Sequence, residues 1–324
     1  MRHLLPSLAL LAASAVAGAH PGHDGNTTNS VSTEPARGSS SLPAPRASIT
    51  EEGTYRVIRA NGIPNHPVGQ FPGPGNPNTI SAQNYNFRMP LHPTTNATFT
   101  ELKHQAMGIA INGIPFDPGT AETWKNDPRS GWHIEAIVGE RKGLGLDQNN
   151  AHVQPNGAYH YHAVPVGLVQ VLGGDTNRMT LLGYAADGFP IYGPLGYSEA
   201  TDPASVLKEL KPSWQLKQGT RPSGASGPGG TYDGTYREDY EFVSGSGDLD
   251  EANGRVGVTP EYPEGTYYYV ATDSFPFYPR ELRGTPDKSF QRQGPPPPPQ
   301  GQMQGPGGPG KRMGPPPFGG PPPR

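Results

Sequence analysis

A Pro-Asn-Gly turn at residues 155–157 constrains the fold of this chain more than any other feature. It separates two runs of strand-forming residues, an arrangement typical of a β-hairpin. On the second predicted strand His160 and His162 are two residues apart, so both imidazoles point to one face of the sheet. Tyr159 and Tyr161 point to the opposite face.

The position of His152 depends on the length of the turn. If the loop has three residues and Gly157 is left-handed, His152 lies opposite His160 and three imidazoles converge on one face. If the loop has only two residues, the register shifts by one and His152 faces Tyr161. The three-residue loop is favoured, because Pro at its first position and Gly at its last suit that turn.

Three convergent imidazoles suit a borderline cation, so His152, His160 and His162 are candidate ligands for copper or zinc. His133 is a fourth candidate, because it shares one face of a further predicted strand with Glu135. The other interpretation is that the histidines are structural and bond the backbone and tyrosines of a packed sheet.

Four residues are predicted to support the ligands by hydrogen bonds, as metal sites usually require: Asp147, Tyr159, Tyr161 and Asp187. Asp147 equally suits a loop cap. Asp187 belongs to the string Asp187-Gly188-Phe189-Pro190, which repeats the pattern of residues 61–64 and 112–115. Each Asn/Asp-Gly pair permits the positive φ of a tight turn, and turn formation alone accounts for Asp187.

Short strands alternate with Gly/Pro turns along most of the chain, which contains 45 Gly and 41 Pro. The predicted strands are residues 55–58, 106–111, 131–138, 159–164, 180–185, 236–243 and 266–272. Helix signal is weak and is confined to residues 202–210, with Asp202 as N-cap, and to residues 122–125. The pattern predicts a mainly β protein with few short helices, as a single β-sandwich or barrel-like domain over residues 50–293.

A second segment repeats the hairpin pattern. Leu-Asp, two further residues, Asn, a Pro-containing turn, Gly and an aromatic strand occur at 146–162 and again at 249–270. The second copy has Tyr268 where the first has His160, and Val270 where the first has His162. Because the strand forms without histidines in one copy, the repeat favours a functional role for them in the other.

The ends of the chain predict export. Residues 1–19 are typical of a signal peptide, residues 20–49 of a disordered linker, and residues 294–324 of a disordered Pro/Gly-rich tail that could bind a cell-surface or matrix polymer. No apolar run is long enough for a membrane span. The predicted location is therefore secreted or extracytoplasmic.

Composition excludes several functions. The chain has no Cys, which rules out disulfides, a thiol nucleophile and an iron–sulfur cluster, and its net charge of −3 gives no attraction to nucleic acid. The Gly-x-Ser-x-Gly, His-Glu-x-x-His and phosphate-loop motifs are absent. Two functions remain: a metal-binding protein whose catalysis is open, or a non-catalytic surface or matrix module with structural histidines.

The string Tyr159-His160-Tyr161-His162, the downstream segment at 183–193 and the segment at 253–269 together resemble the YHYH domain family. The resemblance covers roughly residues 55–290. It implies an exported protein and carries no particular activity. Family members often have Cys near the positions of Gln148 and Ala252. Because neither residue is Cys in this chain, a disulfide or thiol role does not carry over from the family.

Overall fold

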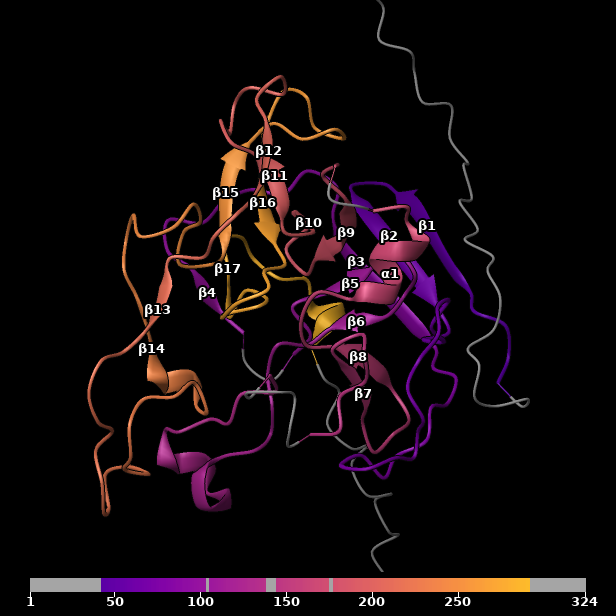
Figure 1. Ribbon diagram of the computed structural model, residues 1–324. Helices are drawn as coiled ribbons and strands as arrows, with labels where there is room; N and C mark the ends of the chain where they lie inside the picture. The colour runs from indigo at the N-terminus through magenta and orange to yellow at the C-terminus, as the bar shows by residue number, and fades with distance from the viewer. Residues whose placement is uncertain (1–41, 103–104, 138–143, 175–176, 292–324) are drawn as a thin grey trace, which may run out of the picture. The chain divides into compact units, whose positions relative to one another are not determined.

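The computed structural model describes residues 42–102, 105–137, 144–174 and 177–291, and these segments are mainly β with few short helices (Figure 1). The strands are β1 (Ala47–Glu52), β2 (Tyr55–Ala60), β3 (Tyr85–Pro90), β4 (Thr100–Glu101), β5 (Gly108–Ala110), β6 (Pro115–Phe116), β7 (Ala151–Val153), β8 (Tyr159–Tyr161), β9 (Leu181–Ala185), β10 (Pro190–Tyr192), β11 (Leu195–Tyr197), β12 (Leu207–Glu209), β13 (Trp214–Leu216), β14 (Tyr240–Phe242), β15 (Gly254–Gly257), β16 (Thr266–Val270) and β17 (Glu281–Leu282). The helical elements are α1 (Val166–Val171) and the 3-10 turns η1 (Trp124–Asn126), η2 (Pro128–Ser130), η3 (Arg237–Asp239) and η4 (Lys288–Phe290).

An eight-stranded mixed sheet organises the chain, in the order β15-β16-β10-β9-β5-β6-β8-β7. Its β10–β16 and β6–β8 pairs are parallel and its other pairs are antiparallel. β15 and β7 lie at its edges, so the sheet is open within the described residues. The hairpin that carries the histidines therefore occupies one edge of the sheet.

The main core lies between this sheet and the three-stranded sheet β1-β2-β3. Ile58 of β2 and Met89 of β3 belong to the same buried cluster as Ile109 and Phe116 of the large sheet. The turn at Gly113 has a φ of +81°, and a Cβ there would lie 2.2 Å from the Cβ of Ala60. This close approach explains why the turn needs glycine, and it fixes β2 against the large sheet.

The three predicted Asn/Asp-Gly turns are confirmed. Gly62, Gly113 and Gly188 have φ angles of +64°, +81° and +96°. In each case the preceding Asn or Asp side chain accepts a hydrogen bond from the N–H two residues later. The sequence pattern therefore encodes the entry into the next strand.

The predicted three-residue loop of the hairpin is also confirmed. His152 pairs with His160, and Val153 pairs with Tyr159. The N–H of Gln154 donates to the carbonyl of Ala158, which closes a loop of three residues, and Gly157 has a φ of +83°. The register that brings the imidazoles to one face is therefore the one adopted.

Two predicted elements are wrong. Residues 202–210 form no helix: Asp202 caps a turn through the N–H of Ala204, and β12 then pairs with β11. Within the described part of the predicted strand at 131–138, residues 131–137, the pairing is reduced to isolated bridges at His133 and Ile134, because the left-handed Gly131 ends η2 at the start of this segment.

One boundary and one further element also differ from the prediction. The predicted linker ended at residue 49, but β1 begins at Ala47, where its backbone already pairs with Ala60. The helix α1 has no counterpart in the prediction. The predicted signal peptide, most of the linker and the tail lie outside the described residues.

Buried Asp187 gives the fold a pH dependence. Its Oδ2 accepts hydrogen bonds from Tyr269 Oη at 2.6 Å and from the Gly284 N–H at 2.8 Å. Burial nevertheless raises the pKa of this carboxyl from an ordinary 3.8 to about 6. Because the pKa of Asp187 is higher in the folded than in the unfolded chain, its protonated carboxyl stabilises the fold. This stabilisation is complete below pH 3.8 and is lost as the pH rises through about 6.

The variant Asp187→Asn is expected to remove this dependence. A rise in pKa from 3.8 to about 6 corresponds to about 3 kcal/mol. The unfolding free energy of the variant minus that of the wild type should therefore increase by about 3 kcal/mol between pH 3 and pH 7. Urea unfolding across this range measures the difference, and parallel pH curves would contradict the assignment to Asp187.

Candidate metal centre

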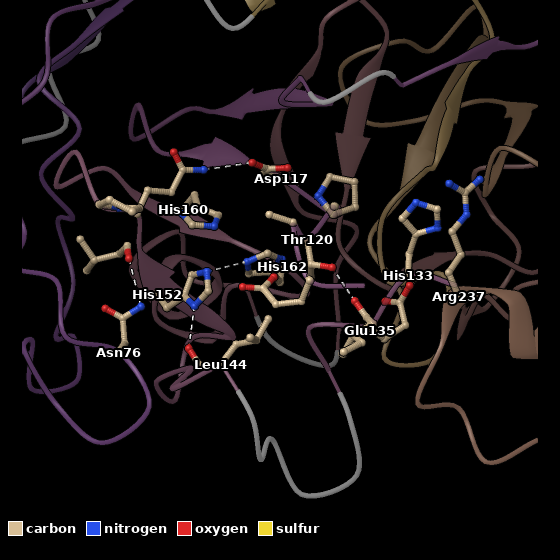
Figure 2. A pocket seen from close by; sticks show the side chains of 18 of the residues that line it. Asn76, Asp117, Thr120, His133, Glu135, Leu144, His152, His160, His162 and Arg237 are labelled. Carbon is tan, nitrogen blue, oxygen red and sulfur yellow. Dashed lines mark hydrogen bonds between the residues drawn. The ribbon is translucent and has the colours of Figure 1, made fainter. Parts of the chain in front are cut away.

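Three histidines converge at the β7–β8 hairpin (Figure 2). His152 and His160 are cross-strand partners, and His162 follows β8 with its N–H bonded to the carbonyl of Asn150 at 2.8 Å. One nitrogen of each imidazole lies within 4.8 Å of the other two, and the Nε2 atoms of His152 and His162 are 3.1 Å apart. His160 and His162 are buried, whereas His152 is partly exposed.

Backbone carbonyls orient two of these rings. Nδ1 of His152 lies 2.7 Å from the carbonyl of Leu144, and Nδ1 of His160 lies 3.3 Å from that of Ala158. Because a carbonyl only accepts hydrogen bonds, the short contact of His152 places the proton on its Nδ1 and the lone pair on its Nε2. This is the arrangement found around metal-binding histidines, in which the other ring nitrogen donates to a carbonyl or carboxylate.

The spacing of the nitrogens suits a small cation. Zn–N bonds of 2.0–2.1 Å at a tetrahedral angle place two ligand nitrogens about 3.3 Å apart. The separation of 3.1 Å between Nε2 of His152 and Nε2 of His162 is close to this value. The cluster could therefore hold a metal ion.

Tyrosines on the opposite face of β8 attach the hairpin to the core. Tyr159 Oη donates to Asp147 Oδ2 at 2.8 Å, and burial raises the Tyr159 pKa well above its ordinary value. Tyr161 Oη lies 2.6 Å from Nε2 of His66, whose pKa is lowered by burial. Both tyrosines are fully buried, so the register of β8 is fixed from the side away from the histidines.

Asp147 supports the hairpin without contacting the histidines directly. Besides Tyr159, its carboxylate accepts from the N–H groups of Gly69 and Asn149, at 2.9 and 2.8 Å. These bonds fix the loop before β7. Asp147 therefore acts on His152 only through the position of the strand, which is the loop-cap role that its sequence context also suited.

The histidine cluster opens onto a cavity of about 570 Å³. Glu135 and Arg280 line another part of it and form a buried ion pair, with Arg280 Nη2 2.6 Å from Glu135 Oε2. Burial raises the pKa of Glu135. Figure 2 shows the cluster, Glu135, His133 and Arg237 around the same cavity.

His133 and Asp187 are not brought into the cluster. His133 lines the cavity, but its Nδ1 bonds to Oε1 of Glu238 at 2.8 Å. Asp187 accepts hydrogen bonds from Tyr269 of β16 and from the backbone N–H groups of Phe189 and Gly284. Within the described segments the metal-compatible group consists of His152, His160 and His162.

Sequence reasoning missed Arg237 and Arg280 as cavity residues and Glu238 as the partner of His133. Glu238 is 105 positions from His133 in the chain, and Arg280 is 145 from Glu135. No local motif marks them. Glu135 was detectable only as the residue that shares a predicted strand face with His133.

The repeat noted in the sequence has the same geometry in both copies. Tyr267 Oη donates to Asp250 as Tyr159 does to Asp147, and Asn150 and Asn253 both have a φ of +54°. The second hairpin, formed by β15 and β16, thus reproduces the scaffold of the first with other side chains at the histidine positions.

Fold and site together define a mainly β protein with a three-histidine cluster on an edge hairpin, a cluster that could hold a metal ion. The family model described as "YHYH protein" matches residues 86–284, which is more than half of the chain. The chain belongs to this family. No curated protein and no solved structure matches it. Within the described residues, no helix has the length and apolar character needed to cross a membrane.

Proposed function

We propose that this protein is exported and binds one copper or zinc ion through Nε2 of His152, His160 and His162. The observation that carries the proposal is the convergence of three imidazole nitrogens within 4.8 Å at the wall of a cavity. Export is supported by the signal-like residues 1–19.

The donor set restricts the metal. Three neutral imidazoles suit zinc and copper, whereas calcium and magnesium take oxygen ligands. Three protein ligands beside a cavity leave a fourth position for water or a substrate, which is the form of catalytic rather than structural zinc sites. The proposed centre is therefore one at which chemistry can take place.

The bonds of Nδ1 support this role over a purely structural one. The carbonyls of Leu144 and Ala158 lie against Nδ1 of His152 and His160, which is how a metal-binding imidazole is usually oriented. One nitrogen of each of the three rings then lies close to a common point. The hydrogen bond between Nε2 of His152 and Nε2 of His162 is the observation that favours the alternative, a surface or matrix module with structural histidines, and metal binding would replace it.

Metal analysis of the full chain, purified without a histidine tag, tests the proposal. We expect about one equivalent of zinc or copper after dialysis against either metal. The double variant His160→Ala/His162→Ala should retain none, because a single imidazole remains. After copper loading, the electron paramagnetic resonance spectrum should show hyperfine splitting from the imidazole nitrogens.

His92→Ala is the matched control, because His92 is exposed and lies outside the cluster. It should keep the full equivalent of metal. Absence of metal from the wild type, together with no thermal shift on addition of zinc or copper, would overturn the proposal. Glycan and protein binding would then be measured instead.

A further inference from the structure

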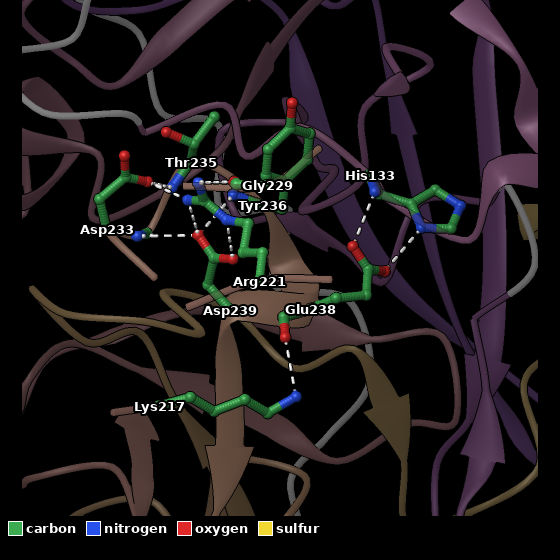
Figure 3. A network of polar contacts seen from close by, with 10 residues as sticks. His133, Lys217, Arg221, Gly229, Asp233, Thr235, Tyr236, Glu238 and Asp239 are labelled. Atoms are coloured by element: carbon green, nitrogen blue, oxygen red, sulfur yellow. Dashed lines mark hydrogen bonds and ion pairs between the residues drawn. The ribbon is translucent and has the colours of Figure 1, made fainter. Parts of the chain in front are cut away.

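The cavity contains a fourth histidine that the proposed metal centre does not use. The backbone N–H of His133 donates to Oε2 of Glu238 at 2.7 Å, and its Nδ1 lies 2.8 Å from Oε1 of the same carboxylate (Figure 3). Because a carboxylate only accepts, Nδ1 carries a proton. In the neutral ring the lone pair is therefore on Nε2.

Backbone pairing holds this arrangement in place. The N–H of Arg237 donates to the carbonyl of His133 at 2.8 Å, and Ile134 forms a bridge with Tyr236. Lys217 Nζ donates to the carbonyl of Glu238 at 2.8 Å. The segment that carries His133 and the turn η3 thus lie side by side with fixed spacing.

Nε2 of His133 is available to a molecule in the cavity. The side chain is 40% exposed and lines the cavity, and Nε2 makes no hydrogen bond within the described residues. An ion pair as exposed as that between His133 and Glu238 adds only about 0–1 kcal/mol to stability. A carboxylate that fixes one imidazole nitrogen while the other faces a cavity is instead the arrangement used for proton transfer.

We propose that His133 is a catalytic base for hydrolysis in this cavity, and that Glu238 is its positioning residue. The proposal rests on the metal centre of the proposed function, which supplies the water. His133 Nε2 takes one proton from that water, directly or through a second water, as the oxygen attacks the carbonyl carbon of an ester.

The step balances without any further reactant. A carbon–oxygen bond forms between the attacking oxygen and the carbonyl carbon, and the bond from that carbon to the alkoxide breaks. The proton held by His133 passes to the leaving alkoxide, so ester and water give acid and alcohol. His133 ends in its starting state.

The charge of the lining favours a neutral acyl substrate over a phosphate ester. The described lining contains four carboxylates and two guanidinium groups, namely Glu101, Asp117, Glu122 and Glu135, with Arg237 and Arg280. Glu122, Glu135, Glu238 and Arg237 are the charged groups around His133. With a divalent metal bound these charges balance, so the lining has no excess of positive charge to hold a phosphate ester.

The zinc-loaded full chain should hydrolyse 4-nitrophenyl acetate, a neutral activated ester, faster than the zinc-free chain. His133→Gln is expected to lower kcat/KM by about 100-fold, the low end of the contribution of a general base. Its zinc content should stay at the wild-type level. Addition of free imidazole to His133→Ala should restore part of the rate.

Glu238→Gln separates positioning from catalysis. It is expected to lower kcat by about 10-fold with little change in KM, because the neutral amide no longer fixes Nδ1–H of His133 and the ring is held less firmly with Nε2 toward the cavity. His92→Gln, at an exposed histidine, should leave both kcat and KM unchanged.

The outcomes distinguish the two proposals. A chain that binds no zinc overturns the metal centre and this inference together. A chain that binds zinc but does not hydrolyse the ester faster than its zinc-free form overturns the inference alone. So does a His133→Gln variant that retains both its zinc and the wild-type kcat/KM.

Discussion

Replacement of Asp239 by alanine is expected to lower the free energy of unfolding by about 3–5 kcal/mol, because it leaves a buried guanidinium without its carboxylate. The Asp239 side chain is fully buried and that of Arg221 is 5% exposed. Nε and Nη2 of Arg221 both donate to Asp239 at 2.6 Å, and the N–H groups of Gly234 and Tyr236 donate at 3.0 and 3.2 Å (Figure 3). All four donors lose their acceptor in the variant.

The remaining acceptors cannot replace Asp239. Asp233 also pairs with Arg221 but is 55% exposed, so much of its charge is screened by water.

Urea unfolding measures the loss, and Glu52→Ala is the matched control. Glu52 and Arg59 form an ion pair of equal length whose side chains are both 47% exposed, and its removal should cost far less than that of the buried pair. Equal losses in the two variants would contradict the role of burial.

The same network links stability to the cavity. Asp239 follows Glu238 directly in η3, and its bonds to Gly234 and Tyr236 fix the backbone on which Glu238 stands. The orientation of His133 therefore depends on an ion pair that does not contact it. Such support from buried neighbours is what holds a functional side chain in one rotamer.

The hairpin could be predicted because the residues that determine its turn and register are close together in the sequence. A Pro-Asn-Gly loop fixes the register, and the period of two along β8 then decides which side chains share a face. His152, His160 and His162 could accordingly be placed together from the sequence. The tyrosines on the other face followed from the same rule.

The erroneous helix at 202–210 had good local signals, and tertiary pairing decided against it. Asp202 and Pro203 suit a helix start, but the same two residues suit a turn. Residues 207–209 then pair with β11, where the backbone hydrogen bonds of a strand replace those of a helix. Propensity over nine residues is too weak to resist such pairing.

The contribution of Glu238 could not be predicted, because nothing local connects it to His133. The two residues are 105 positions apart and meet only where η3 lies beside residues 133–135. The loss of a regular strand at 131–138 is part of the same arrangement. Isolated bridges to Thr123 and Tyr236 replace a continuous ladder there, which leaves the His133 side chain at the cavity.

The two hairpins show which residues the scaffold needs. The Asp–Tyr bond and the left-handed Asn occur in both, so they belong to the fold. At the positions of His152 and His160 the second hairpin has Arg255 and Tyr268, which bond to each other at 2.6 Å. The scaffold at these positions therefore does not itself require histidine, which supports the proposed metal binding.

Saturating zinc or copper is expected to raise the free energy of unfolding of the full chain by about 4 kcal/mol when free metal is about 1,000 times Kd. The ligands lie on both strands of the β7–β8 hairpin and converge only in the folded chain. His162→Ala should lose most of this gain, whereas His92→Ala should keep it. Thermal and urea unfolding with and without metal measure both.

The gain should disappear in acid, because protons and metal compete for the same Nε2 atoms. Ordinary imidazoles become protonated below about pH 6.5, so the metal-dependent part of the unfolding free energy should be full at pH 8 and absent near pH 5. This dependence is opposite in sign to that of Asp187, which loses its contribution as pH rises. Measurement of wild type and His162→Ala at both pH values separates the two effects. A metal-dependent gain that persists at pH 5 would contradict ligation by histidine.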